Sequence, residues 1–548
     1  MVVGTEEGFA LGACTLWLLT ALADQLRSRS HSAHADDGGL QAAGRAEFRR
    51  VAWQYLPVYA LGTLGDWMQG GHLYALYQSY SYSISHIGHI FAIGYTSAAL
   101  LGTYAAAFGD RYGYRLCVIV YGLVYSLECL SMNWDSTAVL LAGRVCGGVA
   151  YSLLFVSFES WLVAEGQARQ LPGESMGQLF AMATTVNALS AVAGGTLAQL
   201  TLELGRESAE EAGANIYVAP FNAAAVPLLG CSLCAALLWR ERYSREALGG
   251  GRDRSDSERV VRREGGEEAE GERPPRARTG SQGESVTAQL LDSLRRLRRD
   301  PTLLHIGVLS SLYEATLYAF VFLWTPALES RASLAAALAS ADVLDVLGPS
   351  EAVTISHGKI FSLLMLCKAV GSRVFACGLG HVSRDAGRGL QRTFALRALK
   401  LTFATSAACL ALPVLSQRYD TTLFAFCAFE LMLGFYWPAV AILRTEFVTE
   451  GRSSMISVFR VLLNVLVIGL LELSGFLSEC AMFSIACTML AASWVSVSVL
   501  QARVQGEASI LAMPAGRPKA SRSDDLEHES RPMLTTEGDS DGDADGFV

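Results

Sequence analysis

Long apolar runs dominate the chain, and most are separated by short polar segments. A helix needs about 20 apolar residues to cross the hydrocarbon core of a bilayer. Scanning with that length gives thirteen runs, which are 8–25, 53–76, 87–108, 115–133, 137–163, 178–201, 217–239, 303–325, 357–378, 395–415, 421–443, 455–475 and 480–501. The pattern predicts an all-α membrane protein in which one leading helix precedes twelve others.

The twelve later runs fall into two sets of six, because a long polar stretch interrupts them once. Part of that stretch, Gly249 to Ser285, has two valines as its only large apolar residues, which predicts a disordered linker. No Lys or Arg precedes the first run, so we expect a retained helix rather than a secretory signal. The expected organisation is a leading helix and loop at 1–52, a bundle at 53–239, a linker at 240–302, a bundle at 303–501 and an acidic tail at 502–548.

Basic residues collect on one side of the predicted spans. The segments on that side contain 34 Lys and Arg residues, whereas the opposite segments contain only three, Arg206, Arg331 and Arg418. Basic loops stay in the cytosol. We therefore expect a multi-pass protein of the plasma membrane with its N-terminus outside and its C-terminus in the cytosol.

Composition supports the membrane class and excludes others. The chain is 51% hydrophobic and 17% charged, with a mean hydropathy of +0.31, so the lipid bilayer is an expected partner. The twelve cysteines are mostly scattered through apolar runs and predict neither a disulfide framework nor a zinc site. No nucleotide loop or nucleophile motif occurs outside the spans, and the arginines of the linker alternate with acids. We expect no enzyme activity, no cofactor, no metal and no nucleic-acid binding.

Ionisable side chains inside the spans are the candidate functional residues. Each costs roughly 2.5–3.5 kcal/mol in lipid, so such groups face a bundle interior or a water-filled cavity. Asp66 and Glu314 lie near the middle of the first span of each set, as a parallel internal repeat would place them. We predict that Asp66, Glu314 or Glu430 takes up the coupling proton. Glu159 and Arg460, toward the cytosolic ends, are predicted to pair as a gate, although Arg460 snorkelling to the inner surface stays open.

The first of the twelve spans also carries polar side chains at helical spacing. Gln69, Tyr74 and Tyr77 follow Asp66 and predict substrate contacts, whereas packing is the alternative reading of the aromatics. Arg144 in the fourth span is a candidate anion ligand, because a guanidinium presents a fork of donors that suits a tetrahedral oxyanion. A salt bridge from Arg144 to Asp66 or Glu128 is its alternative.

The loop between the second and third of the twelve spans reads AAAFGDRYGYRL. With Asp110, Arg111 and Arg115 it resembles the cytosolic motif of the major facilitator superfamily, G-x-x-x-D-R-x-G-R-[RK]. Ala106 and Tyr114 depart from that pattern. The resemblance implies the major facilitator fold, with two six-helix bundles and here one extra N-terminal helix. It also implies that Asp110, Arg111 and Arg115 form an interdomain charge latch that gates transport.

Four longer segments resemble a narrower family. They are DWMQGGHLYALYQSY, GRVCGGVAYSLLFVSFESW, FVFLWTPAL and ELMLGFYWPAV, and they lie in both sets of six spans. In this order they are similar to the eukaryotic molybdate-anion transporters. The resemblance implies uptake of molybdate, or a related oxyanion, by alternating access. Composition and spacing alone do not give that substrate.

Two other functions remain open on the residues alone. The aromatic side chains near Asp66 would also suit a proton-coupled carrier of a sugar or another small solute. A membrane scaffold or sensor that keeps the fold without transport is the second alternative. Uptake of labelled molybdate, with tungstate, sulfate and sugar as competitors, separates the three.

Overall fold

The computed structural model describes residues 40–242, 286–341, 355–382, 388–448 and 452–511, and these residues form helices without any β-strand. The helices of the first set are α2 (Leu40–Gly70), α3 (Leu73–Ser79), α4 (Ile84–Tyr112), α5 (Tyr114–Ser131), α6 (Thr137–Ala168), α7 (Gly173–Ala212), the 3-10 turn η2 (Ile216–Val218) and α8 (Ala219–Leu238). Those of the second are α11 (Val286–Arg299), α12 (Pro301–Ala341), α13 (His357–Val382), α14 (Arg388–Leu415), α15 (Tyr419–Phe447), α16 (Arg452–Leu473) and α17 (Glu479–Leu511).

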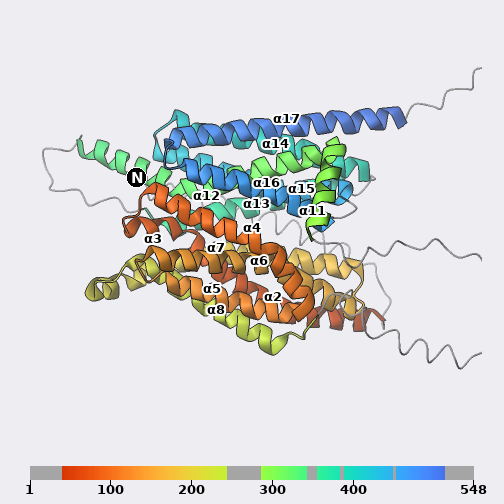
Figure 1. The fold of residues 1–548 in the computed structure, drawn as a ribbon, viewed down its shortest axis with the longest axis horizontal. Helices are drawn as coiled ribbons and strands as arrows, with labels where there is room; N and C mark the ends of the chain where they lie inside the picture. Colours follow the sequence, from red (N-terminus) through yellow and green to blue (C-terminus); the bar gives the residue numbers. More distant parts are fainter. Residues whose placement is uncertain (1–39, 243–285, 342–354, 383–387, 449–451, 512–548) are drawn as a thin grey trace, which may run out of the picture. The chain divides into compact units, whose positions relative to one another are not determined.

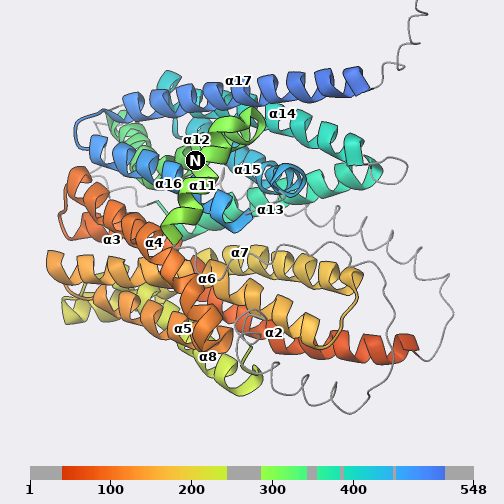
Figure 2. The same ribbon diagram turned by 45° about the vertical axis from the view of Figure 1, so that its right-hand side comes forward.

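The helices of each set pack mainly on one another (Figure 1). In the first set α6 packs on α4 and α5, α8 packs on α5, and α2 contacts both α7 and α8. In the second set α15 packs on α13 and α14, and α12 packs on α15 and α16. The two sets meet where α7 packs on α13 and where α4 packs on α16, as the turned view also shows (Figure 2).

One predicted span differs from its helices. The run 53–76 is interrupted, because α2 ends at Gly70 and α3 begins at Leu73. Gly70 lies against the Phe361 ring of α13, and a Cβ there would come within 2.7 Å of a ring carbon. The apolar pattern gives no sign of the Phe361 contact, because α13 lies far away in sequence.

The turn between α4 and α5 explains the glycine at position 113 of the loop motif. Gly113 has a φ of 101°, a conformation that favours glycine, and it ends α4. Its N–H donates to the carbonyl oxygen of Gly109, 2.9 Å away. A sharp turn at this position lets α5 start within one residue of the end of α4.

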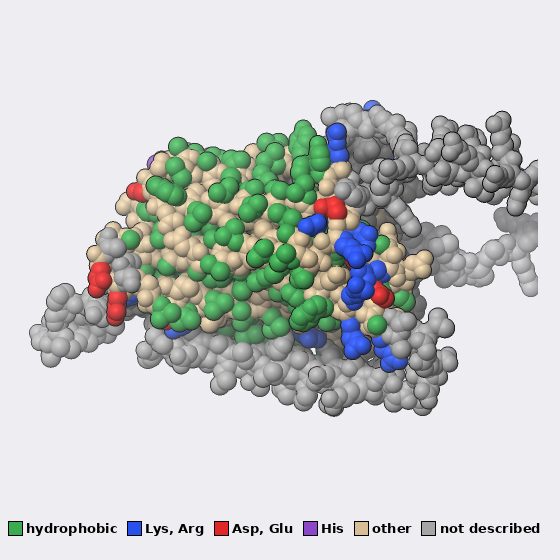
Figure 3. Space-filling model, turned by 90° about the horizontal axis from the view of Figure 1, so that it is seen from below, with side chains coloured by type: hydrophobic (Ala, Val, Ile, Leu, Met, Phe, Trp, Pro, Cys, Tyr) green, Lys and Arg blue, Asp and Glu red, His purple; other side chains and the backbone are tan. Residues whose placement is uncertain are grey.

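Ten of the described helices are long and apolar enough to cross a membrane. The helices α2 and α16 cover two more predicted spans, whereas the predicted leading helix at 8–25 lies outside the described residues, as do 243–285 and 512–548. The face drawn in Figure 3 is covered mainly by hydrophobic side chains, and Lys and Arg side chains gather toward one end of it. The prediction of an all-α, multi-pass membrane protein is confirmed.

Candidate functional site

Two predicted acids occupy similar surroundings in the two sets. The Tyr125 hydroxyl donates to Asp66 Oδ1 at 2.6 Å, and the Tyr436 hydroxyl donates to Glu314 Oε1 at 2.7 Å. Glu314 also forms an ion pair with Arg444, whose Nη2 lies 2.8 Å from Glu314 Oε1. Within the described residues, Asp66 has no cation at ion-pair distance. Glu314 is therefore neutralised by a cation, whereas Asp66 has only a hydroxyl group as its partner among the described residues.

Arg144 on α6 is already paired inside the first set. It forms an ion pair with Glu128 on α5, whose side chain is fully buried. A Cβ at position 147 would overlap the Glu128 carboxylate, so Gly147 makes room for the pair. The Tyr77 hydroxyl lies within electrostatic range of Arg144, although it donates to Met132 Sδ at 3.7 Å. The structure thus realises one of the two salt bridges that the sequence left open, the one between Arg144 and Glu128.

Gln69 and Tyr74 have local partners instead. Gln69 Nε2 donates to the carbonyl oxygen of Gly65 in the same helix at 3.3 Å. The Tyr74 ring packs edge-on against Phe322 of α12, with the two ring centroids 5.7 Å apart. Both side chains are buried, and in the described part of the chain no hydrogen bond joins either to Arg144. Their role in binding stays a prediction.

A second cation, Lys368 on α13, faces the first set. Its Nζ lies 5.3 Å from the centroid of the Trp67 ring of α2. Glu430 on α15 is the acid that acts on it electrostatically, yet no acid of the described residues comes within ion-pair distance of Lys368. Glu430 is buried, and its Oε2 has no hydrogen-bond partner among the described groups. The sequence placed Lys368 within a span but gave no reason to select it.

Three tyrosines and an arginine lie in contacts between the two sets. The hydroxyls of Tyr151 on α6 and Tyr318 on α12 are 2.9 Å apart. Tyr318 also packs edge-on against Tyr95 of α4, with ring centroids 4.8 Å apart. Arg460 on α16 lies over the Phe155 ring of α6 at 5.6 Å. Like Lys368, Arg460 has no ion-pair partner in the described part of the chain and contacts an aromatic ring of the opposite set.

The predicted gate residues are spread over several contacts. The Arg115 guanidinium donates to the Ala236 carbonyl oxygen at 2.6 Å, and Arg111 is exposed over the Tyr112 ring. Asp110 belongs to the last turn of α4, but its side chain lies outside the described residues.

Glu159 and Arg460 are both exposed side chains, and the described contacts of Arg460 lie with Phe155. No ion pair between Glu159 and Arg460 occurs among the described residues. The roles of all five residues in gating remain predictions.

A charge network that the sequence did not single out lies near the motif. The buried Glu165 accepts from Arg169 Nε at 2.5 Å and from Arg242 Nε at 2.6 Å, and Arg169 also pairs with Glu47. This network joins the end of α6 to the start of α2 and to the segment after α8. From the sequence, only the pair of Glu165 with Arg169 could be expected, because the two residues lie four apart on one helix face.

The opposite end of the bundle, which we call the α3 end, is closed between the two sets. The rings of His72 and His357 have centroids 6.1 Å apart, and His357 Nε2 lies 2.8 Å from Glu329 Oε1. Close by, α7 and α13 approach so tightly that a Cβ on Gly358 would come within 2.5 Å of the Gly195 carbonyl oxygen. Backbone contact of this kind leaves no passage between α7 and α13 at this level.

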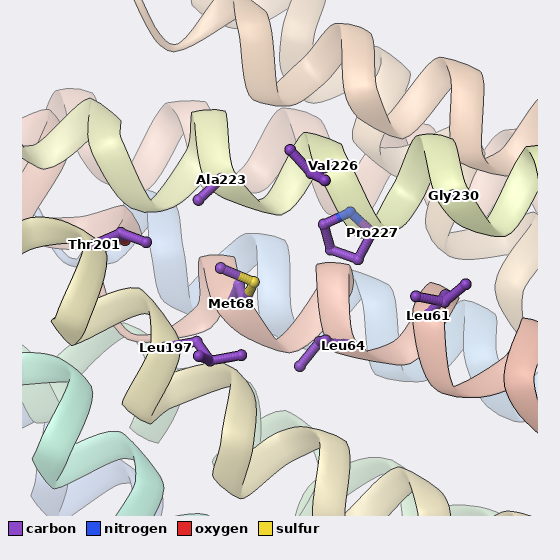
Figure 4. A pocket seen from close by; sticks show the side chains of 9 residues that line it. All are labelled: Leu61, Leu64, Met68, Leu197, Thr201, Ala223, Val226, Pro227 and Gly230. Atoms are coloured by element: carbon purple, nitrogen blue, oxygen red, sulfur yellow. The ribbon is translucent and has the colours of Figure 1, made fainter.

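An apolar groove lies elsewhere and is not the site. It encloses about 390 Å³ between α2, α7 and α8 (Figure 4). The lining residues are Leu61, Leu64, Met68, Leu197, Thr201, Ala223, Val226, Pro227 and Gly230. None of them is ionisable, so the groove offers nothing that would hold a charged substrate.

Comparison with known proteins shows which fold the chain shares. A family model described as sugar transporters with 12 TM matches residues 27–252 and 277–435. Among solved structures, the nucleoside transporter NupG has a TM-score of 0.56 at 10% identity, covering 82% of this chain and 98% of that one. Tetrameric PepTSo2 has a TM-score of 0.55 at 10% identity, covering 85% and 99%. These structures share the fold alone, which is that of a multi-pass membrane transporter.

Curated relatives are closer. The molybdate-anion transporter of Xenopus laevis is 28% identical over 529 residues, covering 93% of this chain and 97% of the relative. That of Takifugu rubripes is 30% identical over 451 residues, covering 80% and 82%. The chain belongs to the major facilitator superfamily and, within it, to the molybdate-anion transporter family. The predicted major facilitator fold and the family are confirmed, apart from the number of helices, and relatives and family alike are transporters rather than enzymes.

Proposed function

We propose that this protein carries a small oxyanion, most simply molybdate, across the membrane by alternating access of its two helix sets. The names of the relatives support this substrate. The residues support an anion independently, through two cations within the spans that have no acid at ion-pair distance among the described residues. Each of them, Lys368 and Arg460, comes from the second set and contacts an aromatic ring of the first.

These two cations are the observation that carries the proposal. An uncompensated charge within a membrane span is costly, and it is retained where it serves a substrate pathway. Arg144 and Arg444 are different, since each is neutralised by its own glutamate. An anion that enters between the sets would supply the counter-charge that Lys368 and Arg460 lack. Arg144 and Tyr77 remain predicted substrate contacts, and Arg144 would first have to exchange Glu128 for substrate.

The closed α3 end gives the proposed state and orientation. The excess of basic residues in the opposite loops places those loops in the cytosol. We therefore assign the α3 end to the outside, the N-terminus to the outside and the C-terminus to the cytosol of the plasma membrane. The tight contact of Gly195 with Gly358 then corresponds to an inward-facing carrier with its outer end shut. Residues 240–302 would link the two sets on the cytosolic side.

Proton coupling follows from the charge of the substrate. A dianion that enters a cell against an inside-negative potential moves uphill by about 2.3 kcal/mol per charge per 100 mV. Asp66 is the proposed proton acceptor, because protonating it disturbs only a tyrosine hydrogen bond. Protonating Glu314 would break an ion pair, and protonating Glu430 would leave Lys368 without its nearest acid.

Uptake by purified protein in liposomes tests the function. We expect accumulation of labelled molybdate that is reduced by unlabelled tungstate and unaffected by a sugar. Competition by sugar instead of tungstate would assign a solute carrier of another class. No uptake of any of these solutes, under an inward proton gradient, would favour the scaffold and contradict the proposal. Liposomes without protein are the matched blank.

A further inference from the structure

One indole ring, that of Trp67, orders two hydrogen-bond donors around itself. Trp67 Nε1 lies 2.9 Å from Asn187 Oδ1 of α7. An indole N–H can only donate, so the Asn187 atom that faces it must be the oxygen. The amide NH₂ of Asn187 is therefore turned away from the ring, and in the described part of the chain it has no protein acceptor.

The ammonium of Lys368 is the second donor. It lies over the face of the same indole, and three N–H donors there meet no acid at ion-pair distance within the described residues. A cation–π contact compensates such a charge only partly, by about 0.5–2 kcal/mol. Both donors thus have bonding capacity left over.

Close helix packing fixes these side chains in place. A Cβ on Gly434 of α15 would overlap the Lys368 carbonyl oxygen, so α13 and α15 touch at the level of Lys368. On the other side, a Cβ on Gly194 of α7 would come within 2.9 Å of Trp67 Cβ. The donors therefore lie on backbones that are held firmly within their own sets.

We propose that Lys368 and Asn187 form an oxyanion-binding subsite, with Trp67 as the positioning residue between them. The ammonium and the amide NH₂ bind oxygens of the tetrahedral dianion, and the indole keeps both donors aimed in its absence. The subsite takes one donor from each helix set, so an anion bound there joins α7 to α13. This proposal rests on oxyanion transport, and it adds the residues that hold the anion.

Asn187→Asp is the sharpest variant. The aspartate keeps the shape of the side chain and an oxygen for the Trp67 N–H, but it replaces the free NH₂ donor by an anionic oxygen beside Lys368. We expect the dissociation constant for labelled molybdate, measured on purified protein, to rise by roughly 10- to 100-fold, as for loss of a charge-assisted hydrogen bond. Asn187→Leu loses the donor without adding charge and is expected to weaken binding less.

Lys368→Met removes the charge and keeps the length of the side chain. It is expected to weaken molybdate binding by a similar factor, and Lys368→Arg is expected to restore much of it. Lys400→Met is the matched control, because Lys400 also lies over an indole, that of Trp494, at 5.2 Å, but within the second set alone. We expect Lys400→Met to bind molybdate as the wild type does.

The outcomes separate the subsite from the transport function. If Asn187→Asp and Lys368→Met bind molybdate with the same dissociation constant as the wild type, the subsite is overturned and the transport function stands. Wild-type protein that binds neither molybdate nor tungstate would overturn the transport function itself. If Lys368→Met does not run as a single species in gel filtration, Asn187→Asp decides the question, since it keeps the size and shape of the native side chain, and unchanged affinity in that variant alone overturns the subsite.

Discussion

Each helix set has an arginine–glutamate ion pair, but only the second set also has cations in its spans without an acid at ion-pair distance among the described residues. In the first set Arg144 pairs with Glu128, and Asp66 remains without a cation among the described residues. In the second set Arg444 pairs with Glu314. The second set also contains Lys368 and Arg460, which have no acid at ion-pair distance among the described residues, and the buried Glu430. The sets thus match in their structural pairs and differ in the groups that are free to bind.

This difference suggests a division of labour between the sets. A free acid suits a proton, and free cations suit an anion, so the two ions of a symport would bind on opposite sides of one interface. The paired arginines then serve mainly to hold α5 against α6 and α12 against α15. Four changes test this division, from the largest expected effect to the smallest.

Arg144→Ala should have the largest effect. It leaves the fully buried Glu128 without a counter-charge, and loss of one partner of a buried pair costs about 3–5 kcal/mol. We expect a large drop in thermal stability, followed by the intrinsic fluorescence of the purified protein. The double change Arg144→Met with Glu128→Leu should recover most of that stability. Recovery of molybdate uptake as well would show that Arg144 is not a ligand.

Asp66→Asn should remove proton-driven accumulation. The amide oxygen still accepts from Tyr125, so the fold is kept, but the side chain no longer takes up a proton. One coupled proton gives about tenfold accumulation per pH unit, so a gradient of about two units contributes roughly 100-fold. We expect this factor to vanish while exchange of labelled for unlabelled molybdate continues. Undiminished accumulation would assign coupling to another acid.

Gly358→Ala should weaken the closed outer end. The new methyl group would press on the Gly195 carbonyl oxygen, and overpacking of this kind costs about 1–3 kcal/mol. We expect a larger outward-open population, seen as faster labelling of a cysteine introduced at the α3 end. Gly380→Ala on the same helix is the control, because nothing lies within 4 Å of the position that its methyl group would take. Equal labelling in both variants would argue against closure at this contact.

Tyr318→Phe should have the smallest effect. It removes the hydrogen bond to Tyr151 but keeps the ring against Tyr95, and one such bond contributes about 1 kcal/mol. We expect a change in uptake rate of about fivefold or less. A complete loss would mean that the Tyr318 hydroxyl contacts substrate directly.

The fold was largely predictable, because hydropathy and helix length report on lipid directly. The pattern located the long described helices, although no apolar run covers α11 and the run 53–76 joins α2 to α3. It did not show the break between Gly70 and Leu73, nor the contact of Gly70 with Phe361 of a distant helix. Hydropathy gives the position of a helix along the chain but does not indicate which residues pack against it.

The candidate site was predictable only in part. Ionisable residues within the spans stand out because burying a charge in lipid is costly, and Arg144 and Glu430 were selected in this way. Which charge is neutralised depends on partners from other helices, and the sequence gives no sign of them. Lys368 and Asn187 went unselected for that reason, because their importance comes from sharing the Trp67 ring.

The most direct test measures molybdate and protons together. Purified wild-type protein is placed in liposomes, and labelled molybdate uptake and internal pH are followed with and without an inward proton gradient. We predict that molybdate accumulates above its external concentration only with the gradient and that protons enter with it. Equal accumulation without the gradient, or no molybdate uptake under either condition, would contradict proton-coupled oxyanion transport.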